Sequence, residues 1–186
     1  MNMITRSHTL EQPNDWKSQI RDAFRDPEQL LDALALDVNG VNLSRKATES
    51  FPFLVTRAYA QRIRQGDPHD PLLRQVLPVI DETIIHENYV DDPVAEQPLL
   101  RDSSLIQKYH GRVLLMVTAA CAINCRYCFR RTFPYSEAVG GQRLKRAIDA
   151  IAENMSVSEM MLSGGDRLII DYEQLSAIFR AVNAIP

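Results

Sequence analysis

The chain has 186 residues, of which 45% are hydrophobic and 24% charged, and its net charge at neutral pH is −3. The length allows a domain with its own hydrophobic core, and the composition is ordinary for a globular protein. A slightly acidic chain lacks the basic surface that attracts nucleic acid or an anionic membrane, so we expect neither as a partner.

Nothing in the sequence has the pattern of a targeting segment or a membrane span. The longest apolar run, VLLMV, is long enough only for a strand. The N-terminal stretch MNMITRSHTLEQPNDW lacks the continuous apolar core of a secretory signal. The 3 cysteines are crowded into one short segment, which argues against a disulfide framework and suits a reducing compartment. We therefore expect a cytoplasmic protein.

Residues 1–100 are predicted to form a helical and wrapping region. A helix should start at DPEQLLDALAL, with Asp26 as N-cap and Pro27 in the first turn. A second helix is predicted over FLVTRAYAQRIRQG, ending at Gly66. A short helix at LLRQVL should interrupt the proline- and aspartate-rich segment that follows. We interpret Trp16, Phe24, Leu30, Leu31 and Leu34 as packing residues.

Beyond residue 112 the pattern changes to alternating strands and helices. VLLMVT and EMMLSGGD indicate two strands, and QRLKRAIDAIAENM and YEQLSAIFRAVNAI indicate two amphipathic helices. The Met160/Met161 pair is predicted to pack on a buried strand. Two βα units indicate an α/β fold with a parallel sheet, whose functional groups should follow the carboxyl ends of the strands. Because two such units leave a sheet edge unpaired, we expect the chain to be the front part of a longer protein.

The cysteines lie in the loop TAACAINCRYCFRR, directly after the first of these strands. Cys121, Cys125 and Cys128 have the spacing Cys-x3-Cys-x2-Cys. Three thiolates can hold a [4Fe–4S] cluster that keeps one iron open, because sulfur is the usual donor to such clusters. Zinc would need a fourth ligand, for which only His110 is near in sequence. Redox sensing and simple burial of the cysteines stay open as alternatives.

The cysteine spacing and the turn SGGD together resemble the radical S-adenosylmethionine (SAM) enzymes. The stretches DPLLRQVLP, KYHGRVLLMVTAACAINCRYCFRR and MMLSGGD narrow the resemblance to the lysine 2,3-aminomutase family. Within it, the chain resembles the branch that makes (R)-β-lysine for modification of translation elongation factor P. The resemblance implies that residues 101–186 are the start of an incomplete (β/α) radical SAM barrel.

The resemblance also implies roles for individual residues. Cys121, Cys125 and Cys128 would hold the cluster, and Tyr127 would lie near the SAM adenine. Arg130 matches the arginine that pairs with the substrate carboxylate, a task that suits a guanidinium fork. The remaining matches are Ser163, Gly164, Gly165 and Asp166 at the SAM site, and Tyr109 and Arg112 near the phosphate of pyridoxal 5′-phosphate (PLP).

Two positions depart from the family pattern: Lys108 replaces an arginine of some relatives, and Arg167 replaces a proline. In the family, the lysine that anchors PLP and the acidic groups that hold the substrate ammonium lie beyond position 186. The implied partners are L-lysine, an electron donor such as flavodoxin, and a functional link to elongation factor P and its ligase. The other hypotheses are a non-catalytic zinc or iron–sulfur module and an inactive truncated product.

Overall fold

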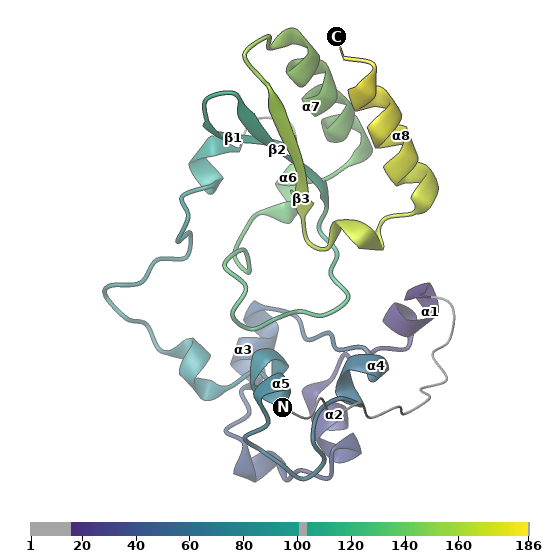
Figure 1. Cartoon of the computed structure of the whole chain (residues 1–186). Coiled ribbons are helices and arrows are strands. Elements are labelled where there is room, and N and C mark those ends of the chain that lie inside the picture. The colour runs from purple at the N-terminus through teal and green to yellow at the C-terminus, as the bar shows by residue number, and fades with distance from the viewer. Residues whose placement is uncertain (1–15, 101–103, 186) are drawn as a thin grey trace, which may run out of the picture.

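The computed structural model describes residues 16–100 and 104–185 (Figure 1). The first range holds helical elements only: α1 (Trp16–Arg21), α2 (Pro27–Ala33), η1 (Val38–Gly40), α3 (Arg45–Ser50), α4 (Arg57–Ala60), α5 (Pro71–Val76), η2 (Ile80–Thr83) and η3 (Gln97–Leu99). The second holds β1 (Leu105–Tyr109), β2 (Arg112–Thr118), α6 (Tyr135–Ala138), α7 (Gly141–Glu153), β3 (Glu159–Gly164), η4 (Arg167–Ile169) and α8 (Tyr172–Asn183). The expected α/β class is confirmed.

Residues 16–83, which we call the helical unit, hold five helices that begin after a residue whose side chain accepts a backbone N–H of the first turn: α2, η1, α3, α4 and α5. Asp26 accepts the Glu28 N–H at 2.9 Å, and Pro27 occupies the first turn of α2, as predicted. Asp70 caps α5, which covers the predicted LLRQVL helix except for Leu77. These helices are too short to be stable alone, so their shared core must hold them.

The predicted helix over residues 53–66 is largely wrong. Residues 53–55 are not helical, and Val55 pairs with Phe24 in an isolated antiparallel bridge. The helix begins only after Thr56, whose hydroxyl caps it, and α4 ends at Ala60. Val55, Tyr59 and Ile63 all pack in or against the same core, but of the three only Tyr59 lies in the helix: Val55 is in the bridge, and Ile63 follows the end of α4. Gly66 does occupy the left-handed region, with φ at 72°.

One compact cluster of side chains forms the core of the helical unit. Leu30, Leu31, Val55, Leu73 and Val76 are fully buried in it. Phe24 and Leu34 also belong to this cluster, which confirms the packing role predicted for them, for Leu30 and for Leu31. Trp16 does not: its side chain is 41% exposed. Ile123, from the cysteine loop, packs against the same cluster.

The sheet has the strand order β1-β2-β3. The predicted parallel pair is present as β2 and β3, with Leu115 opposite Leu162. The strand β1 was not predicted; it is short and pairs with β2 in antiparallel fashion. A tight turn joins β1 to β2, and Gly111 makes it possible with φ at 73°.

Helices α7 and α8 lie side by side over one face of this sheet (Figure 1). Val113, Leu115 and Val117 of β2 face these helices and form one core cluster with Ile151 of α7 and Ile178 of α8. The alternate residue Met116 packs on the opposite face, which the segment around α6 covers. β2 is therefore buried on both faces, as its continuous apolar run predicted.

Three apolar residues of the predicted helices and strand are exposed, and the packing predicted for Met161 is wrong. Met155 is 86% exposed because α7 ends at Glu153, before it. Met161 is 39% exposed, because β3 alternates between covered and open positions and is not buried throughout. Phe179 of α8 is 46% exposed.

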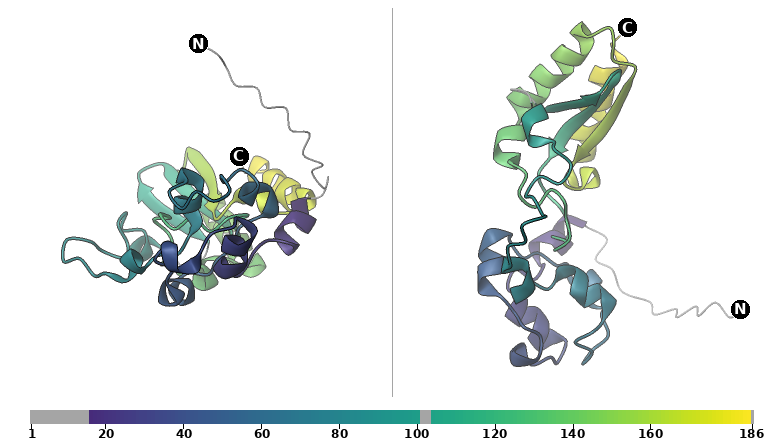
Figure 2. Two further views of the ribbon diagram at one scale, coloured as in Figure 1. Left: turned by 90° about the horizontal axis from the view of Figure 1, so that it is seen from below. Right: turned by 90° about the vertical axis from the view of Figure 1, so that its left-hand side faces the viewer.

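Figure 2 shows the helical unit and the sheet unit, residues 104–185, from two further sides, and its right-hand view separates the two units, with connecting loops between them. None of the helices in the described ranges is both long and apolar enough to cross a membrane. The N-terminal stretch judged not to be a signal falls mostly in residues 1–15, outside the described residues. The expected boundary after residue 100 falls beside residues 101–103, which are likewise outside them.

Candidate cluster-binding site

The cysteine loop and the SGGD turn meet at the carboxyl ends of β2 and β3. Thr118 and Gly164 are partners in the parallel register. Beyond them, the Gly165 N–H donates to the Thr118 carbonyl at 2.8 Å, and the Asp166 N–H donates to the Ala120 carbonyl at 2.7 Å. Parallel pairing thus brings together two loops that are far apart in sequence, as expected for this class of sheet.

Both glycines of the turn are required by the space available. A Cβ atom at Gly164 would lie 2.2 Å from the Thr118 carbonyl oxygen, and φ at this residue is 126°. A Cβ atom at Gly165 would lie 2.2 Å from the Ala120 carbonyl oxygen and 3.0 Å from Cys121 Sγ. Any side chain would therefore push the turn away from the first cysteine.

The three cysteines are free thiols on the loop, and each is half-buried. The Cys128 N–H donates to the Cys125 carbonyl at 3.1 Å, which folds the CRYC segment into a tight turn. Burial raises the pKa of the Cys121 thiol, and the neighbouring Cys128 and Asp166 raise it further. Across the described ranges, no group of three or more His, Cys, Asp or Glu side chains has a geometry that could hold a metal ion. The thiols share a loop without converging on one point.

Arg130 is buried, with 9% of its side chain exposed, and paired with Glu96, which is equally buried. Its Nε and Nη2 donate to the two carboxylate oxygens of Glu96, at 2.7 and 2.8 Å. Its Nη1 donates to Ser163 Oγ at 2.8 Å. One guanidinium therefore links the segment before β1, the cysteine loop and the SGGD turn.

Tyr135 is a second contact to the turn that sequence reasoning missed. Its hydroxyl donates to the Gly164 carbonyl at 3.2 Å, and its ring packs edge-on against Phe133. Burial raises the pKa of Tyr135 to about 12, so the phenol stays a neutral donor. The FPY sequence after the cysteine loop carried no signal for this role, because only the fold brings it beneath the turn.

The helical unit holds the other side of the cysteine loop. The Asn124 N–H donates to the Leu54 carbonyl at 3.0 Å, and the Asn124 side-chain amide donates to the Pro52 carbonyl at 2.9 Å. The Arg126 N–H donates to the Gln75 carbonyl at 2.8 Å. The loop is thus fixed by backbone hydrogen bonds to both units.

The outer members of the predicted SAM set are exposed. Tyr127 is 69% exposed, and its hydroxyl lies 3.3 Å from Gln75 Oε1. The Asp166 carboxylate caps η4 by accepting the Leu168 N–H at 3.0 Å. Arg167, the departure from the family proline, follows at the first position of η4 and is exposed.

Tyr109 and Arg112 do not join this site. They flank the turn between β1 and β2, at the opposite end of β2 from the cysteine loop, roughly 20 Å away along a seven-residue strand. Tyr109 is 61% exposed, and Arg112 pairs with Glu159 across the strands at 2.6 Å. His110 lies in the same turn, so the structure does not bring it to the cysteines as a zinc ligand.

Two comparisons with known proteins bear on this site. The sequence profile described as "4Fe-4S single cluster domain" matches residues 110–185. The chain is 41% identical over 182 residues to L-lysine 2,3-aminomutase of Escherichia coli (strain K12), covering 96% of this chain and 53% of the relative. The resemblance to the lysine 2,3-aminomutase family is confirmed.

Two further lysine 2,3-aminomutases are also similar to nearly the whole of this chain, at lower identity. Identity is 35% with the protein of Buchnera aphidicola subsp. Baizongia pistaciae, over 98% of this chain and 54% of the relative. It is 30% with that of Clostridium subterminale, over 93% of this chain and 42% of the relative. The chain thus spans about half the length of the curated aminomutases that it matches, and the similarity includes the helical unit as well as the sheet.

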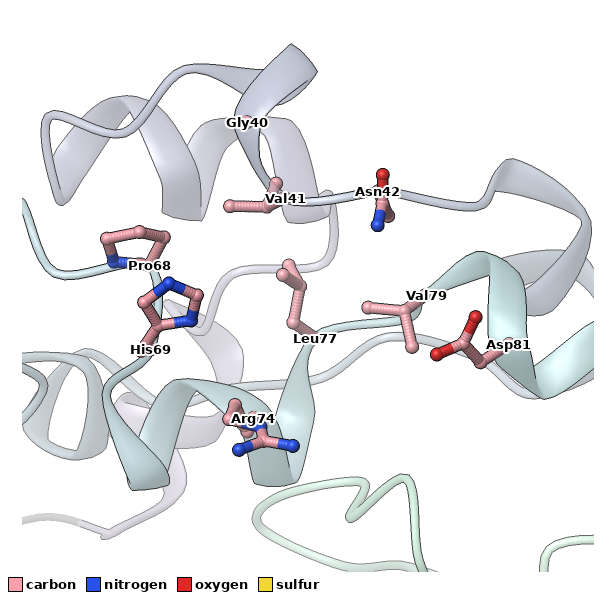
Figure 3. Close-up of a pocket in the computed structure, with 9 residues that line it drawn as sticks. All are labelled: Gly40, Val41, Asn42, Pro68, His69, Arg74, Leu77, Val79 and Asp81. Atoms are coloured by element: carbon pink, nitrogen blue, oxygen red, sulfur yellow. The ribbon is translucent and has the colours of Figure 1, made fainter.

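Two cavities of the aminomutase-like chain are relevant to the choice of site. One, of about 340 Å³, adjoins the cysteine loop and is lined in part by Cys128, Glu82 and Arg131. The other, of about 380 Å³, lies within the helical unit, with His69 and Arg74 among its lining residues (Figure 3). No predicted site residue lines the second cavity, so the first is the one connected with the cysteines.

Proposed function

We propose that this chain forms the part of a radical SAM, PLP-dependent isomerase that holds the iron–sulfur cluster and SAM. The reaction would be the conversion of L-lysine to (R)-β-lysine, for modification of elongation factor P. The observation that carries the proposal is the seating of the SGGD turn against the cysteine loop. Its backbone hydrogen bonds and its missing Cβ atoms bring the turn to within contact distance of Cys121.

The donor set fits a [4Fe–4S] cluster better than a closed zinc site. Cys121, Cys125 and Cys128 would supply three sulfur ligands, and among the described residues no histidine is placed to complete a tetrahedral zinc site with them. Cluster binding requires the three Sγ atoms to turn toward one point. When bound, the cluster and SAM together would supply the radical that starts the reaction, and the protein would bind, orient and exclude water.

Arg130 is proposed to pair with the substrate carboxylate. Glu96 engages its Nε and Nη2 and so fixes the guanidinium plane, which leaves the Nη1 edge directed at Ser163. A carboxylate would approach along this edge, next to the SAM turn. Fixing the fork in advance lowers the entropy cost of binding.

The same family assignment supports two further proposals. The three-stranded sheet would be the start of a (β/α) barrel, since β2 and β3 are parallel and carry both functional loops at one end. The PLP phosphate would lie toward Tyr109 and Arg112, at the other end of β2. L-lysine, flavodoxin or a similar electron donor, and the ligase of elongation factor P would be the partners of the whole protein, in the cytoplasm.

Anaerobic reconstitution of this chain with iron and sulfide tests the proposal. We expect about four irons per chain, a broad iron–sulfur absorption, and an electron paramagnetic resonance signal of the reduced cluster that SAM perturbs. Cys128→Ala should lose the cluster, because three thiolates are its only proposed ligands. Tight stoichiometric zinc with no uptake of iron would favour a metal-binding module instead. A cluster that ignores SAM would contradict the radical SAM assignment.

A further inference from the structure

A buried carboxylate, Glu82 of η2, lies between two arginines of the cysteine loop. Its side chain is 11% exposed. Arg126 Nη2 and Arg131 Nη1 lie 2.7 and 2.8 Å from the same oxygen, Glu82 Oε2. Burial alone would raise the pKa of Glu82, but hydrogen bonds, first of all from Arg126, outweigh it and lower the pKa, so the carboxylate stays charged.

All three side-chain nitrogens of Arg126 donate hydrogen bonds to acceptors in the helical unit. Nε reaches both oxygens of Glu82, at 3.0 and 3.1 Å. Nη1 donates to the Phe51 carbonyl at 2.7 Å, and Nη2 also donates to the Ala47 carbonyl at 2.9 Å. The guanidinium lies 5.1 Å from the centre of the Phe51 ring. Arg126 directly follows Cys125, so this set of bonds fixes the backbone next to that thiol.

Arg131 holds the far end of the segment that begins at Arg126. Its Nη1 donates to the Arg126 carbonyl at 3.2 Å, in addition to its bond with Glu82. Its backbone N–H donates to the Cys128 carbonyl at 3.2 Å. The two arginines therefore bracket Cys128, and one carboxylate holds both of them.

We infer that Glu82 is a positioning residue for the cluster-binding loop, acting on Cys125 and Cys128 through Arg126 and Arg131. The inference rests on the proposed function, because it takes the cysteines as cluster ligands. The cavity of about 340 Å³ supports it, since Glu82, Arg131 and Cys128 line the same hollow. Residues that orient metal ligands from outside the ligand set typically govern metal affinity.

The physical reason for a carboxylate at this position is charge compensation. Without it, two guanidinium groups would stand together in a largely buried site, and each would lose its principal acceptor. The segment between Cys125 and Cys128 would then move to give the arginines access to water. Neutral glutamine keeps the shape of Glu82, and its carbonyl oxygen can still accept the Val79 N–H, which Glu82 Oε1 accepts at 3.1 Å.

Comparison of Glu82→Gln with Asp81→Asn tests the inference. Asp81 is the preceding residue of η2 and is exposed, so the two variants remove the same charge from one helix. After anaerobic reconstitution, loss of iron to a chelator should be roughly tenfold faster, or more, in Glu82→Gln than in the wild type. Asp81→Asn should match the wild type.

The reduction potential of the cluster separates positioning from mere stability. Removal of a negative charge beside Cys128 should make reduction easier and raise the potential in Glu82→Gln. Lower thermal stability with an unchanged potential and unchanged iron loss would overturn the inference. If Glu82→Gln does not fold, Arg131→Gln serves instead, because it removes only one of the two ion pairs of Glu82. This variant should lose iron faster than the wild type, but more slowly than a loop that has lost both ion pairs. Wild-type retention in that variant would also overturn the inference.

The two proposals fail in different ways. If the wild-type chain takes up no iron–sulfur cluster, the proposed function fails, and this inference fails with it. If the wild type holds a cluster that responds to SAM, and Glu82→Gln holds it equally well, only the role of Glu82 is refuted.

Discussion

At the scale of single residues, the site depends on a glycine, Gly165, because there is no room for a Cβ atom where the SGGD turn meets the cysteine loop. Gly165 has an ordinary backbone conformation, so its identity is not explained by a left-handed turn. A glycine is needed here because of a close approach: an added Cβ atom would lie 2.2 Å from a carbonyl oxygen of the cysteine loop. The glycine is needed because two backbones meet there.

We therefore expect Gly165→Ala to destabilise the chain by about 1–3 kcal/mol, because the clash is with backbone atoms that cannot rotate away. Chemical denaturation measures the change. Gly40→Ala is the matched control, since Gly40 has no atom within 4 Å of its added Cβ. Equal stability of the two variants would show that the turn does not press against the loop as described.

At the scale of elements, short helices of the helical unit depend on their N-caps. Asp70 is buried and accepts three backbone N–H groups, from Leu72 and Leu73 in α5 and from Arg64 before it, at distances of 2.8, 3.2 and 3.1 Å. Burial alone would raise the pKa of Asp70, but these donors and the Arg64 charge outweigh it and lower the pKa. The carboxylate thus joins α5 to the preceding loop.

Asp70→Ala should cost about 1–2 kcal/mol of stability at neutral pH, through loss of the cap. Because the folded pKa of Asp70 is lowered, its contribution is complete above the unfolded value of about 3.9 and is lost as pH falls through the folded value. The stability difference between wild type and Asp70→Ala should accordingly shrink in acid. Thermal melts across this pH range measure it. Asp26→Ala, at an exposed cap with one backbone donor, should cost less; a constant difference for Asp70→Ala would contradict the argument.

At the scale of the whole molecule, the cysteine loop is the joint between the helical unit and the sheet. The amides of Asn124 and Arg126 donate to the helical unit, and those of Gly165 and Asp166 donate to residues at the end of β2 and the start of the loop. A ligand that fixes the loop should therefore stabilise the hydrogen bonds of the loop with the helical unit and those with the sheet unit.

Cluster reconstitution should slow hydrogen exchange at Asn124 and Arg126 as well as at Gly165 and Asp166. The reason is that a ligand of the folded loop stabilises every hydrogen bond that opens when the loop opens. Exchange measured by mass spectrometry, with and without cluster, checks this result. The Leu34 amide in the core of the helical unit is the internal control and should change little. Slower exchange confined to residues 121–128 would contradict the loop's role as a joint.

The sequence by itself determined the features that rest on local patterns. Capping residues set the start of α2, the continuous apolar run set β2, and the cysteine spacing with the SGGD turn pointed to the lysine 2,3-aminomutases, to which the comparisons find the chain similar. It failed where burial arises from distant contacts: the 53–66 helix became a bridge and a shorter helix, and β1 went unseen.

Only the tertiary structure decided which charged side chains surround the cysteines. Glu82 and Glu96 lie in a segment that reads as surface wrapping, because nothing local distinguishes a buried carboxylate from an exposed one. The fold buries each beside an arginine of the cysteine loop, at 2.7 Å, across more than thirty residues of sequence. A buried charge requires a partner, and that partner is set by where the chain returns in space, not by neighbouring residues in the sequence.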